Sequence, residues 1–179
     1  MFRSKSVPLR DGRRALLRRA LPGDAEAIIA HVNAIGAEQV YLMTDRLAYS
    51  PEQERAFLAQ CNADRENELY LVALVAGEIV GTANFSRGRR EKIRHTASLG
   101  IALRKDLRGV GLGTEMMRAG IDWARTVGIR KLTLGVFSTN RAAIGLYRKL
   151  GFRAEGRLRG QAIIRGRLVD ELLMALWMT

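Results

Sequence analysis

Hydrophobic residues recur with two different periods along this chain, and each period predicts one kind of element. Apolar residues that alternate or run together predict strands at 14–21, 68–75, 78–85, 95–103, 131–137, 152–158 and 168–177. A period of about 3.6 residues predicts helices that begin near residues 25, 51, 112 and 141. No repeat, low-complexity linker or break in composition interrupts this order. The pattern therefore predicts one α/β domain with a mixed sheet.

Capping residues agree with two of the predicted helix starts. Ser50 followed by Pro51 and Gln53 is typical of a helix start, because serine and glutamine form a capping box and proline suits the first helical position. Asn140 is a candidate N-cap for the last helix, which we expect to end at Gly151. Each signal fixes where a helix begins and so where the preceding loop lies.

The segment between the strand at 95–103 and the helix from residue 112 is the strongest local feature. It contains glycine at alternate positions and reads Arg108-Gly109-Val110-Gly111-Leu112-Gly113-Thr114. Glycine lets a ligand approach the backbone closely, and the unpaired N–H groups of a helix's first turn favour an anion. We therefore predict a phosphate pocket built from the backbone N–H groups of residues 108–114. The alternative is a glycine-rich turn that only caps a buried helix.

The spacing of the glycines distinguishes among known phosphate loops. A dinucleotide fingerprint needs G-x-G-x-x-G, but Thr114 stands where the last glycine would be. The Gly-Lys-Ser/Thr ending of a P-loop is absent from the sequence. The remaining pattern, Arg108-x-x-Gly111-x-Gly113, resembles the acyl-CoA pyrophosphate loop of the GNAT superfamily of N-acetyltransferases.

Two later motifs carry the same resemblance. Residues 140–152 match N-x-x-A-x-x-x-Y-x-x-x-G-F, which is similar to the second signature of GNAT enzymes, and they lie one helix and one strand after the glycine loop. Residues 166–174 resemble the G-x-x-x-D-x-x-x-M ending of members that act on amines and protein N-termini. The resemblance covers roughly residues 14–177 of the chain.

This resemblance implies an α/β (α+β) fold: a mixed, mostly antiparallel sheet with helices on both faces. The domain would span residues 14–179 and follow an N-terminal extension of residues 1–13. Two central strands, 97–104 and 131–137, would splay apart, and the first would carry a bulge. Splayed strands leave backbone groups unpaired, and the two amides of pantetheine can bond there like an extra strand.

The function implied is that of an acetyl-CoA-dependent N-acetyltransferase, with no metal. The enzyme would move an acetyl group to a primary amine by direct attack of the amine on the thioester. The acceptor would be a small amine, an amino-acid-like molecule or a protein N-terminus. The expected cofactor-binding residues are Ile101, Ala102, Leu103, Arg108, Gly109, Val110, Gly111, Leu112, Gly113, Thr114, Asn140 and Ala143.

Tyr147 is the candidate general acid. On a helix Asn140, Ala143 and Tyr147 share one face, so the phenol reaches the CoA sulfur if that face looks into the splay. Tyrosine, with a pKa of about 10, can donate a proton to the leaving thiolate at neutral pH. The alternative is a tyrosine at the edge of the core with its hydroxyl in water. Asn140 either binds CoA, caps its helix or does both.

The general base is harder to identify. Many GNAT members carry a glutamate on the strand before the glycine loop, but residues 95–100 contain no carboxylate. His95 is the candidate base because histidine titrates near neutral pH, and a surface histidine without a role is the alternative. Glu91 is a weaker candidate in a predicted loop, and an ordered water chain or an amine that arrives neutral would also suffice. We expect His31 to be structural.

Acceptor recognition in this fold falls to the segment between the first two helices and to the late strands, here residues 36–49 and 156–167. The first segment contains Glu38, Tyr41 and Asp45, which suit a cationic amine. The second is rich in arginine, which suits an acceptor that bears a carboxylate. These two predictions conflict, and the sequence leaves both open.

Composition adds a strong positive charge to this picture. The chain has 179 residues, a formal net charge of +12 and a pI of about 10.9. Such a surface attracts a polyanionic cofactor, an acidic protein or the ribosome. A basic GNAT-like domain that binds RNA or the ribosome with little catalysis is therefore the alternative function. Aromatic residues make up only 6% of the chain, which argues against a surface that stacks bases.

The other features of the sequence bear on the cell compartment, on metal binding and on partners. No segment approaches the roughly 18 apolar residues of a membrane span, so no membrane partner is expected. A single cysteine, Cys61, cannot form an internal disulfide, which fits the reducing cytoplasm. Two distant histidines and one cysteine do not suit a structural zinc site. Because dimers are common in the superfamily, a homodimer is expected.

Overall fold

The computed structural model describes residues 2–41 and 47–178 of the chain. Its strands are β1 (Lys5–Pro8), β2 (Arg14–Arg19), β3 (Glu68–Val75), β4 (Glu78–Arg87), β5 (Thr96–Leu103), β6 (Lys131–Phe137), β7 (Arg153–Ile164) and β8 (Arg167–Trp177). Its α-helices are α1 (Ala25–Gly36), α2 (Pro51–Ala63), α3 (Leu112–Thr126) and α4 (Arg141–Lys149). Short 3₁₀ turns are η1 (Pro22–Asp24), η2 (Glu91–Ile93) and η3 (Lys105–Leu107). The predicted strands and helices are present, and β1 is added before them.

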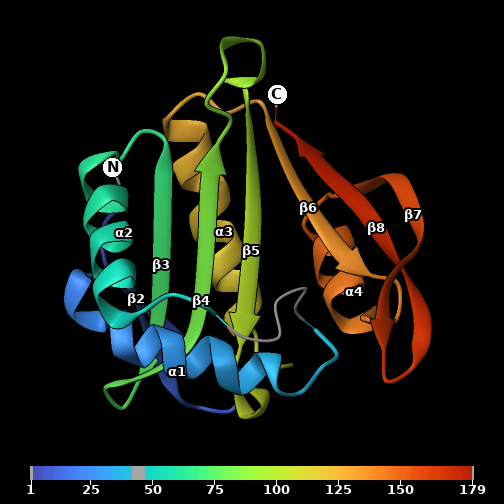
Figure 1. The fold of residues 1–179 in the computed structure, drawn as a ribbon. Coiled ribbons are helices and arrows are strands. Elements are labelled where there is room, and N and C mark those ends of the chain that lie inside the picture. Colours follow the sequence, from blue (N-terminus) through green and yellow to red (C-terminus); the bar gives the residue numbers. More distant parts are fainter. Residues whose placement is uncertain (1, 42–46, 179) are drawn as a thin grey trace.

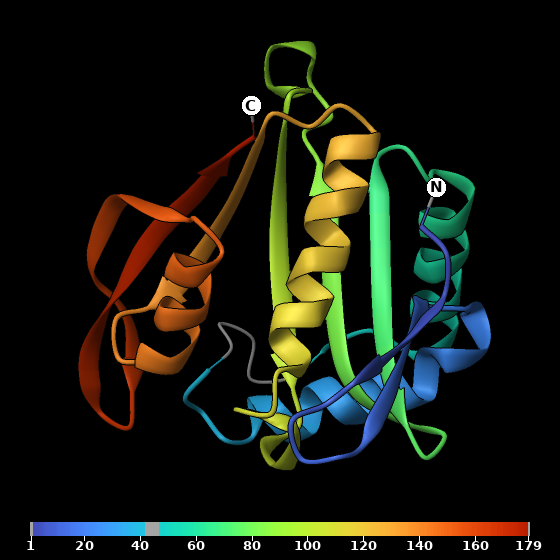
Figure 2. The ribbon, with the colours of Figure 1, turned by 180° about the vertical axis from the view of Figure 1, so that it is seen from behind.

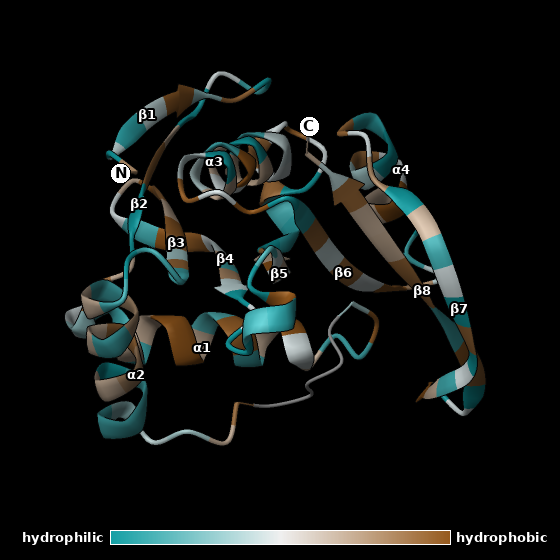
Figure 3. Cartoon of the chain, turned by 90° about the horizontal axis from the view of Figure 1, so that it is seen from above, coloured by the Kyte–Doolittle hydropathy of each residue, from teal (hydrophilic) through white to brown (hydrophobic). Residues whose placement is uncertain are grey.

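These strands form one mixed sheet in the order β1-β2-β3-β4-β5-β6-β8-β7. Neighbouring strands are antiparallel except for β5 and β6, which are parallel. Helices α3 and α4 cover one face of the sheet, and α1 and α2 lie on the other (Figures 2 and 3). The predicted fold class, a mostly antiparallel sheet with helices on both faces, is confirmed.

The two central strands splay apart as predicted. Strands β5 and β6 pair only from Thr96 opposite Lys131 to Ser98 opposite Thr133. Beyond Ser98 they diverge, while β6 stays paired with β8 as far as Phe137 (Figure 1). The edge of β5 from Leu99 to Leu103 therefore has no strand partner on its β6 side among the described residues.

The bulge expected in β5 does not appear in its pairing with β4. The register there runs without a shift from Gly81 opposite Leu103 to Arg87 opposite Ala97, over residues that are all described. A register shift occurs instead between β3 and β4, at Ala73 and Leu74. The expectation was wrong because the splay needs only that β6 turn towards β8, and β5 can continue straight.

Helix α3 is fixed closely against the sheet. Its residues Leu112, Met116 and Met117 are fully buried. A Cβ on Gly120 would overlap the ring of Phe85 on β4, so glycine is needed there for the close approach. This contact sets the position of the helix and hence of the glycine loop at its start.

The predicted caps hold the starts of α2 and α4. The Ser50 hydroxyl accepts a hydrogen bond from the Gln53 backbone N–H at 3.3 Å, and the Gln53 side chain accepts one from the Ser50 N–H at 2.9 Å. At α4, the Asn140 side chain accepts a hydrogen bond from the N–H of Ala143 at 3.2 Å. Capping is thus one role of Asn140.

The residues before position 14 pack against the rest of the molecule. Strand β1 pairs with β2, and Val7 and Leu9 are buried in the main core. The backbone N–H of Arg10 donates to the carbonyl of Val110 in the glycine loop at 3.0 Å. Division of the chain at residue 14 stays a prediction, but residues 5–10 help to support the loop.

Strand β7 is longer than predicted. It continues from Arg153 to Ile164 and turns directly into β8 at Arg167, where the sequence indicated a break from 159 to 167. Most of its residues are exposed, so the hydrophobic alternation that marks a half-buried strand is missing. Among the described helices, none is both long and apolar enough to cross a membrane.

Candidate active site

The glycine loop links η3 to the start of α3. Gly109 and Gly111 have φ values of +78° and +97°, in the region that strains any residue with a side chain. Gly111 is the N-cap of α3, and no side chain of the described residues caps this start. The N–H groups of the first turn are therefore open to a ligand, and the helix dipole favours an anion there.

A cleft of about 510 Å³ lies where β5 and β6 separate. Its walls are the unpaired part of β5, the glycine loop, Gly135 and Val136 of β6, and one face of α4. The predicted site residues that line it are Ile101, Ala102, Leu103, Arg108, Gly109, Gly111, Gly113, Thr114, Asn140, Ala143 and Tyr147. Segments far apart in the sequence thus meet around one hollow, and the roles assigned to these residues stay predictions.

Three predicted site residues do not line the cleft. The side chain of Leu112 is fully buried in the core, and the carbonyl of Val110 is bonded to Arg10. His95 is exposed at the opposite end of β5, where its carbonyl accepts the N–H groups of Arg130 and Lys131. The structure therefore does not bring His95 to the cleft, which begins at Leu99.

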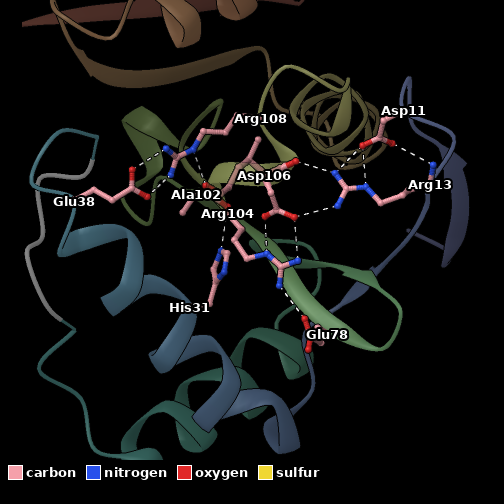
Figure 4. Close-up of polar contacts among 10 residues, drawn as sticks. Asp11, Arg13, His31, Glu38, Glu78, Ala102, Arg104, Asp106 and Arg108 are labelled. Carbon is pink, nitrogen blue, oxygen red and sulfur yellow. Dashed lines mark hydrogen bonds and ion pairs between the residues drawn. The ribbon is translucent and has the colours of Figure 1, made fainter.

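Arg108 ties the glycine loop to the segment after α1. Its guanidinium donates to both carboxylate oxygens of Glu38, at 2.8 and 2.6 Å (Figure 4). It also lies 4.4 Å from the ring centroid of Tyr41. Its Nε donates to the carbonyl of Leu103 at 2.9 Å. The hydrogen bonds from Arg108 lower the pKa of Glu38, so this carboxylate stays charged and paired. Glu38 is therefore engaged before any acceptor arrives.

On the other side of β5, His31 supports the strand. The side chain is buried on α1, and its Nε2 lies 3.3 Å from the carbonyl oxygen of Ala102 (Figure 4). Burial lowers the pKa of His31, which keeps the imidazole neutral at physiological pH. These contacts agree with the structural role expected from the sequence.

Tyr147 reaches the cleft from α4. Its side chain is 6% exposed and its ring packs against that of Phe152, with centroids 5.8 Å apart. Burial raises the pKa of Tyr147 to about 12, so the phenol keeps its proton at neutral pH. The tyrosine is thus buried at the wall of the cleft with its proton in place.

At two glycines inside the strands, a side-chain oxygen from the neighbouring strand lies close to where a Cβ would be, and the sequence did not reveal these contacts. A Cβ on Gly135 of β6 would overlap Oε1 of Glu171, which β8 presents next to that strand. A Cβ on Gly100 of β5 would lie 2.9 Å from Oδ1 of Asn84 on β4. Both glycines line the cleft, so these oxygens lie beside its opposite walls. A glycine within a strand was the available signal, because it often marks a close approach.

The first segment expected to recognise the acceptor, residues 36–49, is only partly described. Asp45 lies outside the described residues. Asp170 of the last motif accepts a hydrogen bond from the N–H of Gly160 at 2.7 Å and pairs with Arg157, so it fixes the β7–β8 hairpin.

Within the described part of the chain, no group of three or more histidine, cysteine, aspartate and glutamate side chains could hold a metal ion.

Comparison with known proteins supplies independent information. A family model described as "Acetyltransferase (GNAT) family" matches residues 37–152. The L-methionine sulfoximine/L-methionine sulfone acetyltransferase of Pseudomonas paraeruginosa is 36% identical over 102 residues, which cover 56% of this chain and 59% of that protein. The L-amino acid N-acetyltransferase AaaT of Escherichia coli is 32% identical over 117 residues, 63% of this chain and 70% of that protein.

A solved structure shares nearly the whole fold. The crystal structure of an acetyltransferase of the GNAT family from Streptococcus pneumoniae superposes with a TM-score of 0.86 and 33% identity. The superposition covers 92% of this chain and 99% of that one. By contrast, the chain spans only 59% of the length of the Pseudomonas relative that it matches in sequence.

Proposed function

This chain belongs to the acetyltransferase (GNAT) family, and we propose that it transfers an acetyl group from acetyl-CoA to a primary amine by direct attack on the thioester. The observation that carries this proposal is the cleft itself. One hollow combines an uncapped helix start behind positive-φ glycines, an unpaired strand edge and a buried protonated tyrosine. These features match the three parts of an acyl-CoA: a pyrophosphate, a chain with two amides and a thioester.

The described residues fit acetyl-CoA at both ends of the cleft. Open N–H groups at the start of α3 suit a pyrophosphate, and Arg10 adds a positive charge to the lining. The β5 edge from Leu99 to Leu103 has no strand partner on its β6 side, so it offers backbone groups to the pantetheine amides, although the carbonyls of Ala102 and Leu103 are already engaged by His31 and Arg108. Bound acetyl-CoA supplies the activated acetyl group, and an N–H of this edge can stabilise negative charge on the thioester oxygen.

We assign the proton on the leaving sulfur to Tyr147. The phenol lies in the cleft wall on the α4 face of the sheet, and burial keeps it protonated. When the C–S bond breaks, its electron pair goes to sulfur, which accepts the phenolic proton. The phenolate then takes the proton that the new amide nitrogen gives up. Tyr147 is thereby restored.

We assign the proton of the incoming ammonium to Glu171 instead of His95. A lysine-type amine has a pKa of about 10.4, so it must lose a proton before it can attack. The Glu171 carboxylate lies against Gly135 in the cleft wall, whereas His95 lies at the far end of β5. Glu171 takes the proton and later releases it to water.

Our proposal for the acceptor is a small or amino-acid-like primary amine. The support is in the names of the two relatives, both acetyltransferases of amino acids or their analogues.

The net charge of +12 leaves an acidic or ribosomal protein as a further partner. Cytoplasmic location is supported by the single buried thiol of Cys61. A homodimer is supported by Ile163 and Leu168, exposed and paired on β7 and β8.

Thiol release from acetyl-CoA tests the proposed activity. The protein is incubated with acetyl-CoA and a panel of amino acids, alkyl amines and N-terminal peptides, and acetylated products are identified by mass. We expect CoA release that depends on an amine and matches the amount of N-acetyl product. CoA release without an N-acetyl product, or none with any amine, would contradict the proposal.

A further inference from the structure

A second cavity adjoins the cleft on the α1 and α2 side of the sheet. Its volume is about 260 Å³. The residues that line it come from α1, α2, the segment before α2 and three strands: Val32, Leu47, Tyr49, Glu54, Phe57, Tyr70, Thr82, Asn84, Gly100, Ile101 and Ala102. The last three also line the cleft. A molecule in this cavity therefore reaches the strand on which acetyl-CoA would lie.

Glu54 is the charged group of this cavity. Its side chain is only 2% exposed, and the structure gives it no hydrogen bond or ion pair with any described residue. None of the described residues that line the cavity is a lysine, arginine or histidine, although the chain carries a net charge of +12. A buried carboxylate that pairs with none of the described residues is costly to keep charged. A cationic ligand would remove that cost.

Burial has an observable effect on this carboxyl. It raises the pKa of Glu54 above its ordinary value, and none of the described residues contributes an opposing positive charge. Glu52, two residues earlier on the same helix, shows the opposite behaviour. It is exposed, pairs with Arg55, and has a lowered pKa from backbone and Ser50 hydrogen bonds. The raised pKa of Glu54 thus comes from its burial beside the cavity and is not shared by the exposed glutamate on the same helix.

Aromatic rings share the cavity with this carboxylate. Phe57 and Tyr70 pack edge to face, with centroids 6.1 Å apart, and Tyr49 also lines the hollow. The faces of aromatic rings attract cations, and a carboxylate among them completes a site for an alkylammonium group. A carboxylate-bearing end would be repelled there.

The register of the sheet shows how far the Tyr70 side of the cavity lies from the cleft. Tyr70 on β3 is opposite Asn84 on β4, which is opposite Gly100 on β5. Two strand spacings, about 10 Å, therefore separate the Tyr70 backbone from the cleft wall. A molecule that extends across the cavity from Tyr70 along this register ends beside β5, where Oδ1 of Asn84 lies close to Gly100.

We propose that this cavity binds the acceptor and that Glu54, with its aromatic neighbours, holds a second ammonium group of the acceptor, remote from the amine that reacts. The inference rests on the proposed function and narrows its substrate class. The preferred acceptor is a primary amine joined by an apolar chain to a second cation. Alkyl diamines and a basic amino acid such as lysine fit this description.

Matched pairs of acceptors test the proposal. L-lysine is compared with L-norleucine, and α,ω-diaminoalkanes of increasing length are compared with the monoamines of equal length. We expect kcat/KM to favour the dicationic member by about tenfold or more for the best pair. In Glu54→Gln this preference should disappear, whereas the exposed control Glu52→Gln should keep it. Equal use of both members by the wild type, or a preference retained in Glu54→Gln, would overturn the proposal.

A binding measurement separates this inference from the proposed function. Thermal shifts of the CoA-loaded protein with diaminoalkanes report on the cavity without turnover, and shifts with acetyl-CoA alone show that Glu54→Gln is folded and binds the cofactor. We expect a diamine shift in the wild type that Glu54→Gln loses. Its absence in a wild type that still acetylates amines would overturn the inference and leave the function standing. A diamine shift without acetylation of any amine would refute the function alone.

Discussion

The two hollows that meet at β5 are built in opposite ways. The cleft presents mainly backbone: glycines at positive φ, an uncapped helix start and a free strand edge. The cavity under α2 presents side chains, with the carboxylate of Glu54 among aromatic rings. Backbone groups suit a ligand part that does not vary, whereas side chains discriminate among ligands. We therefore expect the cleft to depend on glycine conformation and the cavity to depend on side-chain chemistry.

Tyr147 is an exception to this contrast, because it is a side chain on which the cleft's chemistry depends. In Tyr147→Phe we expect kcat to fall by about 10²- to 10⁴-fold, the usual contribution of a positioned acid. The Michaelis constant for acetyl-CoA should change little, since a phenyl ring still packs on Phe152. Steady-state kinetics provide the measurement. A variant with full turnover would remove Tyr147 from the mechanism.

The opposite wall provides a test of the base. In Glu171→Gln we expect kcat/KM for the amine at neutral pH to fall by about 10²-fold, because the ammonium loses its proton acceptor. The loss should diminish as pH rises, since more of the amine then arrives neutral. His95→Ala is the comparison, and its rate should match the wild type at every pH because His95 lies outside the cleft. The reverse result would restore His95 as the base.

The dependence of the cleft on backbone is tested at Gly111. A side chain at its φ of +97° costs about 1–2 kcal/mol, so Gly111→Ala should bind acetyl-CoA about tenfold more weakly. Gly12→Ala is a matched control, because Gly12 has a φ of +87° and open space around it in the β1–β2 turn. Both variants should lose stability in thermal melts, but only Gly111→Ala should lose affinity in titration calorimetry. Equal affinities would refute a backbone site.

The smallest expected effect is a change in thermal stability with pH when Glu54 in the cavity is replaced. The raised pKa of Glu54 means that its contribution to stability is present below the ordinary glutamate pKa and is lost as pH rises through the folded-state value. Glu54→Gln should therefore melt above the wild type at pH 8, and the gap should narrow towards pH 4. Glu52, with a lowered pKa, contributes stability that is present above the ordinary value and lost in acid.

Glu52→Gln thus provides the control of opposite sign. Because Glu52 is exposed, its melting temperature at pH 8 should equal the wild type or lie slightly below it. Both variants are measured by thermal denaturation across the pH range. A Glu54→Gln variant that melts below the wild type at pH 8 would mean that the carboxylate has a partner and that the cavity is not prepared for a cation.

The cleft was accessible to sequence reasoning because its parts are local. Gly109, Gly111 and the helix after them lie within one short segment, and Asn140 to Tyr147 lie on one face of a single helix. The splay was expected only from the resemblance to the family, whereas local signals also gave the caps and the order of strands and helices. Each depends on spacing along the chain, which the sequence displays directly.

Pairing between distant segments was not accessible in this way. Glu171 lies against Gly135 of the cleft wall because β8 pairs with β6, and Arg108 meets Glu38, which is 70 positions away along the chain. Glu54 was hidden for another reason: a glutamate in the first turn of a helix is ordinarily exposed, as Glu52 is. Only the packing of α2 on β3 distinguishes the two, and no pattern along the chain records it.

Titration of the wild-type protein with acetyl-CoA, and in parallel with ATP, tests the central claim most directly. Both ligands carry phosphates, but only acetyl-CoA has a chain that bonds along β5 and a thioester that meets Tyr147. We predict saturable binding of acetyl-CoA, with the folded state stabilised by about 2.7 kcal/mol at a hundredfold excess over Kd, and a much smaller effect of ATP. Equal stabilisation by the two, or none by either, would contradict an acetyl-CoA site in this cleft.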